Sequence, residues 1–292
     1  MVLVVQYNTF FLTATMGNTS SQPKNKTGKK VVSQKIENAK KTNILSLTEH
    51  KLEEIPEEVF HLTSLRTLDI SKNKLQRLGN IGRLTELKTL NCDDNSLHSG
   101  AIAPISKLAK LQSLSLGKNR LEDPANQSFP TLPSKIKTLK IHHNSFSSIP
   151  KQIVDPKLRL LEKLDLASNN LASIPAGISN LVALTELILD NNVIVSIPNE
   201  LGQVKKLKAL SLRNNYMQVK STSFTDANPQ PIPASVFEDT LLIDLNLHGN
   251  PMTNTQLNTF EGFDAFLERR KKKKTTALTG GALVSMSVCG LE

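Results

Sequence analysis

The sequence predicts an α/β fold in the form of a curved solenoid. We expect a horseshoe of about nine repeats with a parallel sheet on its concave face, short helical or 3₁₀ turns on its convex face, and a helical C-terminal cap. Three observations lead to this fold class. An eleven-residue pattern, L-x-x-L-x-L-x-x-N-x-L, recurs along the chain. Its copies follow at spacings of 22–25 residues, with one of 35. The segments that flank the copies can cover the two ends of such a stack.

The repeated pattern explains the sheet. In each copy the L-x-L alternation places two leucines on one face of a short strand, so stacked repeats form a parallel sheet with an aliphatic interior. This pattern is that of the leucine-rich repeat family, which the chain resembles. Clear copies occupy residues 65–75, 87–97, 111–121, 161–171 and 184–194, and looser copies occupy 42–52, 136–146, 207–217 and 242–252.

A column of asparagines stands where each repeat turns away from its strand. A buried amide at such a turn can pair with backbone groups of its own and the adjacent repeat. We therefore interpret all eight as structural: Asn73, Asn95, Asn119, Asn144, Asn169, Asn192, Asn215 and Asn250.

Between the copies the sequence offers Ile-Pro followed by aliphatic residues, as in 55–65 and 174–184. Proline fixes φ and opens a short turn, and the aliphatic residues behind it complete the core. Repeats of this length with proline are similar to those of intracellular leucine-rich-repeat proteins that bind GTPases or phosphatases. The long spacing contains residues 218–237, rich in Asn, Pro, Ser and Thr, which we expect to be an inserted loop on the convex side or rim.

The flanks predict two caps of different size. In residues 33–45, Ile36 and Ala39 stand at helical spacing and indicate a short capping turn at best. Residues 254–270 place apolar side chains on one side of a helix that seals the core. These side chains are Leu257, Phe260, Phe263 and Leu267, with Phe266 adjoining.

Charge and composition divide the chain into four segments. Residues 1–41 carry seven lysines against one glutamate, residues 269–274 are all basic, and the middle is close to neutral. We expect residues 1–15 to be a non-native extension, 16–32 a flexible lysine-rich anchor, 33–268 the repeat domain with its caps, and 269–292 a basic disordered tail. A near-neutral body with basic ends argues against binding of nucleic acid.

Signs of catalysis in the sequence are weak, and an enzyme is only a third interpretation. The sequence contains no G-x-x-x-x-G-K-S/T, G-x-S-x-G, H-E-x-x-H or C-x-x-C motif. Its one adjacent histidine pair, His142 and His143, would point to opposite sides of a strand and lacks further metal ligands nearby. We expect no catalytic residues, metal, cofactor or small-molecule substrate. Two cysteines cannot build a disulfide framework, which favours the cytosol.

The concave face is the predicted binding surface. Residues that alternate with the strand leucines, and those just after them, face this side. Charges of both signs alternate along the row, which suits a polar protein partner better than a phosphate backbone; a solvated face without a partner is the alternative. The candidates for contact with an unidentified protein are Asp69, Lys72, Asp93, Asp94, Lys118, Lys140, His142, Lys163, Asp165, Glu186, Asp190 and Arg213.

Residues 16–21, MGNTSS, match the pattern for N-myristoylation if Met16 is the first residue and Gly17 follows it. One myristoyl chain binds membranes only marginally, so a second signal is needed. Lysines near an anionic leaflet supply about 1 kcal/mol each. We expect a lipid on Gly17 to act with these lysines on an anionic membrane surface, at the cytoplasmic face: Lys24, Lys26, Lys29, Lys30 and Lys35.

The alternative is a soluble or nuclear regulatory subunit or adaptor, associated with a phosphatase or ubiquitin ligase and never lipidated. The run at 269–274 would then be an import signal. The C-terminal Cys289 has the spacing of a prenylation box, but the terminal Glu292 argues against it. Residues 16–18, 39–47 and 260–274 resemble the ends of a small lipid-anchored member of the family, a resemblance that implies the same anchor. Residues 1–15, 22–32 and 275–292 have no counterpart there.

Overall fold

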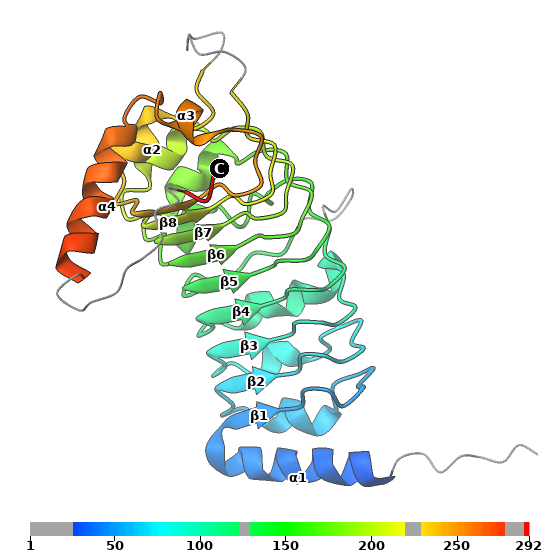
Figure 1. The fold of residues 1–292 in the computed structure, drawn as a ribbon. Coiled ribbons are helices and arrows are strands. Elements are labelled where there is room, and N and C mark those ends of the chain that lie inside the picture. The colour runs from blue at the N-terminus through cyan, green and yellow to red at the C-terminus, as the bar shows by residue number, and fades with distance from the viewer. Residues whose placement is uncertain (1–25, 123–128, 220–228, 278–288, 292) are drawn as a thin grey trace, which may run out of the picture.

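A computed structural model describes residues 26–122, 129–219, 229–277 and 289–291. Nine short parallel strands form one open sheet in which strand order follows chain order (Figure 1). The stack confirms the predicted leucine-rich-repeat solenoid. The strands are β1 Ile44–Ser46, β2 Thr67–Asp69, β3 Thr89–Asn91, β4 Ser113–Ser115, β5 Thr138–Lys140, β6 Lys163–Asp165, β7 Glu186–Ile188, β8 Ala209–Ser211 and β9 Asp244–Asn246.

The register places the central leucine of each strand beside that of the next, for example Leu45 beside Leu68 and Leu187 beside Leu210. These side chains are almost completely buried. Because full burial of one leucine contributes about 1.5–3 kcal/mol, the aliphatic column is the main stabilising feature of the stack.

Short turns line the side opposite the sheet. Proline precedes several of them, at Pro56, Pro175, Pro198 and Pro233. The turns are η1 Glu57–His61, η2 Ile81–Arg83, η3 Ser99–Lys107, η4 Pro156–Leu158, η5 Ala176–Asn180, η6 Asn199–Gln203 and the helix α2 Ala234–Glu238. The expected convex turns are therefore present in the described repeats.

The asparagine column is structural, as predicted. Asn192 is 5% exposed; its Oδ1 accepts the Leu171 N–H at 3.0 Å, and its Nδ2 donates to the carbonyls of Leu166, Leu189 and Asp190. The first repeat has His50 at this place instead. The residue just before each of the nine places has a left-handed backbone, with φ between 51° and 75°.

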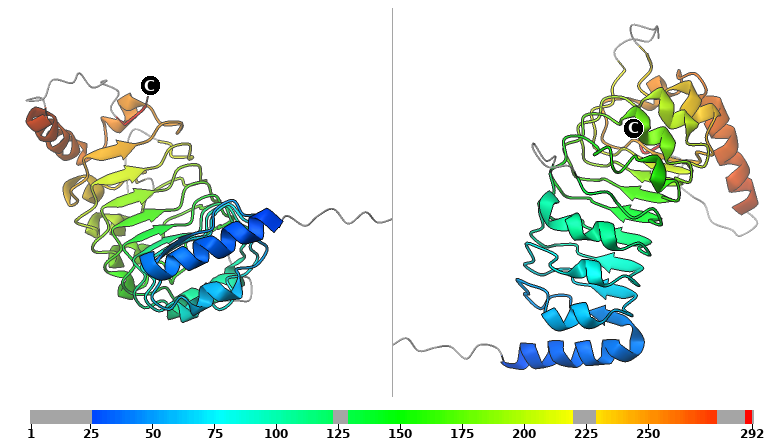
Figure 2. Two further views of the ribbon diagram at one scale, coloured as in Figure 1. Left: turned by 90° about the horizontal axis from the view of Figure 1, so that it is seen from below. Right: turned by 180° about the vertical axis from the view of Figure 1, so that it is seen from behind.

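The N-terminal cap is larger than the predicted turn. Helix α1, Lys26–Thr42, runs for 17 residues across the first repeat (Figure 2). Its buried residues Val32, Ile36 and Ala39 recur every three or four positions, so one side of the helix contacts the core. Residues 26–32, expected to be part of a flexible anchor, are helical.

The C-terminal cap consists of two helices instead of one. Helix α3 covers Asn254–Leu257 and helix α4 covers Phe263–Ala277. Gly262, with φ of 79°, lies between them, because a left-handed residue cannot continue a helix. The expected sealing role is confirmed: Phe263 and Phe266 are at most 1% exposed and pack on Phe237 of α2.

Two further expectations about the C-terminal half were wrong. The second half of the expected insertion is part of the core, since Ile232, Val236 and Phe237 are fully buried around α2; residues 220–228 are not described. The predicted disordered tail is helical as far as Ala277. Cys289 and Leu291 are buried against β9, where the Leu247 N–H donates to the Cys289 carbonyl at 2.8 Å. No helix in the described ranges has the length and apolar character to cross a bilayer.

Candidate functional site

Apart from His142, the concave candidates fall into three groups according to their contacts. The first group comprises aspartates that bind the sheet itself. Asp93 accepts the Gly117 N–H at 2.6 Å and the Ser115 hydroxyl at 2.8 Å. Asp190 accepts the Ser211 hydroxyl at 2.6 Å and the Arg213 N–H at 2.9 Å. These carboxylates satisfy backbone and hydroxyl groups of the next repeat and so have fewer oxygens to offer a partner.

Asp69 and Asp165 have a similar role within their own repeats. Asp69 accepts the N–H and the hydroxyl of Ser71 at 2.9 and 2.6 Å. Asp165 accepts the Ala167 N–H at 3.1 Å. Such bonds fix the turn that follows each strand.

The second group comprises residues in exposed ion pairs. Lys72 bonds Glu49 at 2.6 Å, which raises the pKa of Lys72 and lowers that of Glu49. Lys163 bonds Glu186 across β6 and β7 at 2.9 Å, and this contact raises the pKa of Lys163. Exposed pairs of this kind contribute little to stability and can exchange for contacts with a partner.

The third group is exposed. Within the described ranges, no ion pair is made by Asp94, Lys118, Lys140 or Arg213. Lys140 lies in β5, whereas Asp94 and Lys118 occupy the left-handed turn position just beyond the strands. These side chains are the ones most available to a protein partner.

His142 covers Gly117, where an added Cβ would lie 2.3 Å from its ring. Its ring meets that of His143 edge to face, with centroids 5.3 Å apart. No group of three or more His, Cys, Asp or Glu side chains suited to a metal is found in the part of the chain that is described. Cys92 occupies a core leucine position, and burial raises the pKa of its thiol well above the usual value.

A basic hollow that was not predicted from the sequence lies at the N-terminal ends of the strands. Its volume is about 400 Å³, and it is lined by Arg66, Lys88, Lys110 and Lys135 around the single carboxylate Glu86. Lys110 bonds both oxygens of Glu86, at 2.6 and 2.7 Å, and thereby lowers the pKa of that carboxyl. The signal was present in the sequence, since these residues flank the first aliphatic residue of successive copies, which is Leu in three of them and Ile136 in the fourth.

The predicted anchor residues are only partly within the described structure. Gly17 and Lys24 lie outside it, and the side chain of Lys26 is not described. Lys29 and Lys30 are exposed on α1, and Lys35 is half-buried. Lys30 and Lys35 are five positions apart, so they point about 140° away from each other around the helix. The lysines therefore do not form a single stripe.

The basic run at 269–274 lies in α4 and is not uniform. The Arg269 guanidinium donates to the carbonyls of Phe237 and Leu242, and its desolvation lowers its pKa. Arg269 is thus part of the cap. At the other end of the tail, burial raises the pKa of the Cys289 thiol to about 12. A buried thiol of this kind is a poor nucleophile for modification.

Comparison with protein families finds the leucine rich repeat at residues 40–97, 134–194 and 159–217. The chain is similar to Toll-like receptor 1 of Homo sapiens, with 33% identity over 164 residues, which cover 54% of the chain and 20% of the receptor. It is also similar to the probable serine/threonine-protein kinase pats1 of Dictyostelium discoideum, 31% identical over 59% of the chain and 6% of that protein. The chain thus spans a minor part of these relatives, and no catalytic activity is carried over from them.

Among solved structures, a repeat protein of Leptospira interrogans matches with a TM-score of 0.51 and 26% identity. The match covers 79% of this chain and 73% of that one. This likeness is consistent with the solenoid described above.

Proposed function

This chain is a leucine-rich-repeat protein, and on that premise we propose that it is a non-enzymatic interaction scaffold tethered to the cytosolic side of a membrane by myristate on Gly17. The repeats imply protein–protein interaction. The observation that carries this part of the proposal is the open nine-stranded sheet, whose concave side presents exposed charged side chains, among them Lys118, Lys140 and Arg213, that form no ion pair within the described residues.

The concave surface can be tested with two matched triple variants. In the first, Lys118, Lys140 and Arg213 are changed to Glu. In the second, Lys151, Lys157 and Arg159, around η4, are changed to Glu. Proteins that co-purify with the natural chain should be lost from the first variant and retained by the second. Equal loss from both variants, or from neither, would contradict binding at the concave face.

The anchor is supported by the pattern at residues 16–21 and by the exposed lysines Lys29 and Lys30 that follow it. The order of features at the two ends, in 16–18 and 260–274, also resembles the small family member called leucine-rich-repeat-containing protein 57. That resemblance implies the same lipid at Gly17 and no catalytic activity.

Membrane fractionation of the natural chain and a Gly17→Ala variant tests the anchor. Gly28→Ala is the matched control, since a Cβ at Gly28 meets nothing within 4 Å. We expect Gly17→Ala to move into the soluble fraction and Gly28→Ala to remain bound. Intact mass of the native protein gives the start site and the acyl chain together. A mass that begins at Met1, or a Gly17→Ala variant that fractionates like the natural chain, would favour the soluble or nuclear adaptor.

A further inference from the structure

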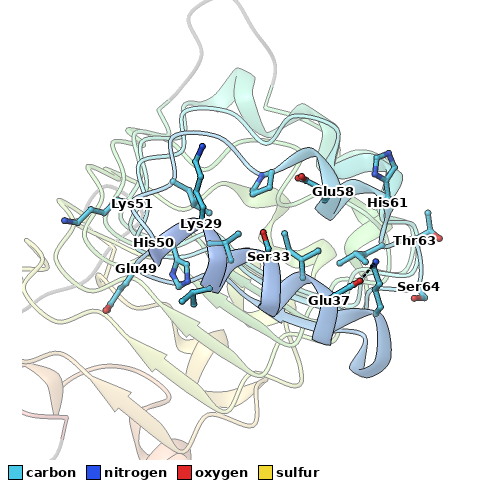
Figure 3. Close-up of a pocket in the computed structure, with 18 residues that line it drawn as sticks. Lys29, Ser33, Glu37, Glu49, His50, Lys51, Glu58, His61, Thr63 and Ser64 are labelled. Atoms are coloured by element: carbon cyan, nitrogen blue, oxygen red, sulfur yellow. Dashed lines mark hydrogen bonds and ion pairs between the residues drawn. The ribbon is translucent and has the colours of Figure 1, made fainter. Parts of the chain in front are cut away.

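A groove of about 1440 Å³ lies at the N-terminal end of the solenoid (Figure 3). Helix α1 forms one wall, and residues between 49 and 64, which follow β1 and include η1, form the other. His50 and Lys51 lie near one end, and His61 and Thr63 near the other. Its volume exceeds the roughly 300–1,000 Å³ of usual small-molecule sites, so it has room for a long apolar chain and the residues attached to it.

The groove exists because α1 does not replace a full repeat. Leu62, at the end of η1, is 7% exposed, whereas the equivalent Leu84 and Leu108 are 0% exposed beneath the preceding repeat. Leu52 is only partly buried, whereas its equivalent Leu75 is 0% exposed.

The helix side of the groove is also incompletely covered. Val31 is 48% exposed, and Val32 and Ile36 keep 9% and 8% of their surface. At the other end of the stack, by contrast, the phenylalanines of α4 are at most 1% exposed. Apolar surface left open at one end of a solenoid is unfavourable in water, so a further apolar group would be stabilised there.

The chain itself can supply that group. Gly28, Lys29 and Val31 line the groove, and Gly17 precedes the start of α1 by only nine residues. Nine extended residues span up to about 30 Å. The 17 residues of α1 extend over about 26 Å. An acyl chain on Gly17 can therefore reach any part of the groove.

We infer that the groove between α1 and the first repeat binds the myristoyl chain of Gly17 in the same molecule, so that the lipid exchanges between the groove and the bilayer. This inference rests on the proposed lipidation. A single myristoyl chain binds membranes marginally and reversibly. An intramolecular site can therefore compete with the bilayer and make the attachment adjustable.

Hydrogen exchange tests the groove directly. The chain that begins at Met16 is produced with and without myristate, and intact mass verifies the acyl chain. Without membranes, myristate should slow amide exchange in residues 28–40 and 50–64 and leave residues 184–217 unchanged. Equal exchange in both forms would overturn the groove and leave the anchor intact. A native protein without an acyl chain would instead remove the anchor, and this inference with it.

A pair of surface variants separates the groove from general effects on folding. Val31→Glu places a charge on the groove wall, and Val182→Glu, at a side chain 53% exposed, is the matched control. With uncharged phosphatidylcholine vesicles, acylated Val31→Glu should bind several-fold more than the natural sequence, because its lipid is released from the groove. Acylated Val182→Glu should bind like the natural sequence. Equal binding of all three proteins would overturn the inference.

Discussion

At the scale of single residues, the fold depends on two columns that recur beside each other. The asparagines satisfy backbone groups of two repeats, and the residue before each of them adopts a left-handed backbone. Eight of these nine left-handed residues carry a side chain, and the ninth is Gly249. The turn geometry therefore takes precedence over the backbone preference of the residue that occupies it.

Removal of one asparagine from the column should clearly lower the stability of the protein. Asn192→Ala removes the acceptor of the Leu171 N–H and the donor to three carbonyls, and three of these four hydrogen bonds are buried. We expect a loss of about 1–3 kcal/mol in the free energy of unfolding, measured in urea. Asn170→Ala, at an exposed position next to Leu171, should change the free energy of unfolding by less than about 0.5 kcal/mol. Equal effects of the two substitutions would show that the column is dispensable.

The residues with a left-handed backbone should tolerate fewer side chains than strand residues do. Substitution should therefore affect stability more at Lys118 than at Lys140, although both are exposed lysines. Lys118 has φ of 51°, a conformation that a β-branched residue tolerates poorly. Lys118→Val should therefore destabilise the protein by about 1–3 kcal/mol, whereas Lys118→Gly should not. Lys140→Val, in a strand, should be nearly neutral in the same urea titration. A neutral Lys118→Val would contradict the assigned turn.

At the scale of elements, most of the stack could be predicted because each strand and turn is specified locally. The Leu alternation, the Asn and the Ile-Pro pairs determine one repeat, and repetition determines the rest. Helix α2 was not predicted, although an Ile-Pro pair, Ile232 and Pro233, precedes it as in other repeats. The polar residues earlier in the 35-residue spacing indicated an inserted loop instead. The length of α1 was readable from Val32, Ile36 and Ala39.

The candidate site was less predictable than the fold. Asp93 and Asp190 look like binding residues in the sequence, but their partners lie in the next repeat, at Gly117 and Arg213. A contact across 23 or 24 residues depends on the relative placement of two turns, which a pattern within one repeat does not contain. The groove beside α1 could not be predicted either. It arises because α1 covers the first repeat only in part, and the pattern within one repeat does not show how completely another segment covers it.

Because the side chains of Cys289 and Leu291 are buried, Cys289 should be protected from alkylation. With its pKa raised to about 12, Cys289 should contain less thiolate than an ordinary thiol and react slowly with iodoacetamide at about pH 8.5. Leu291→Ser, which weakens the packing of residues 289–291, should speed alkylation of Cys289 and leave Cys92 unreactive. Mass spectrometry of labelled peptides measures both sites. Alkylation of natural Cys289 at the rate of a short peptide would contradict the packed segment.

At the scale of the whole molecule, the two ends differ in how well they are sealed. Repeats contact only their neighbours, so unfolding can start at either end and spread. The C-terminal phenylalanines are buried, whereas Leu52 and Val31 at the N-terminal end are not. The stack should therefore open first at α1 and β1.

Hydrogen exchange in the unlipidated protein measures this order. After correction for intrinsic rates, amides of α1 and β1 should show lower protection than those of β6 to β8, with β9 and α4 between them. The central strands act as the internal control. Lower protection in α4 than in α1 would show that the C-terminal end opens first.

The basic clusters lie at opposite ends of the molecule, since α1 crosses one end of the stack and α4 packs at the other (Figure 1). Only the α1 end is joined to Gly17, so the proposed lipid would bring Lys29 and Lys30 to the bilayer and leave α4 remote from it. With about 1 kcal/mol for each lysine near an anionic leaflet, Lys29→Ala with Lys30→Ala should weaken binding to phosphatidylserine-containing vesicles by about thirtyfold.

The matched pair Lys272→Ala with Lys273→Ala removes the same charge from α4 and should change vesicle binding little. Both pairs are compared in acylated protein by vesicle sedimentation, at low and at high salt. The difference should shrink at high salt, because screening removes the contribution of the lysines but not that of the lipid. If the α4 pair weakens binding as much as the α1 pair, the membrane contacts the molecule along its side. The arrangement in which only the α1 end meets the membrane is then wrong.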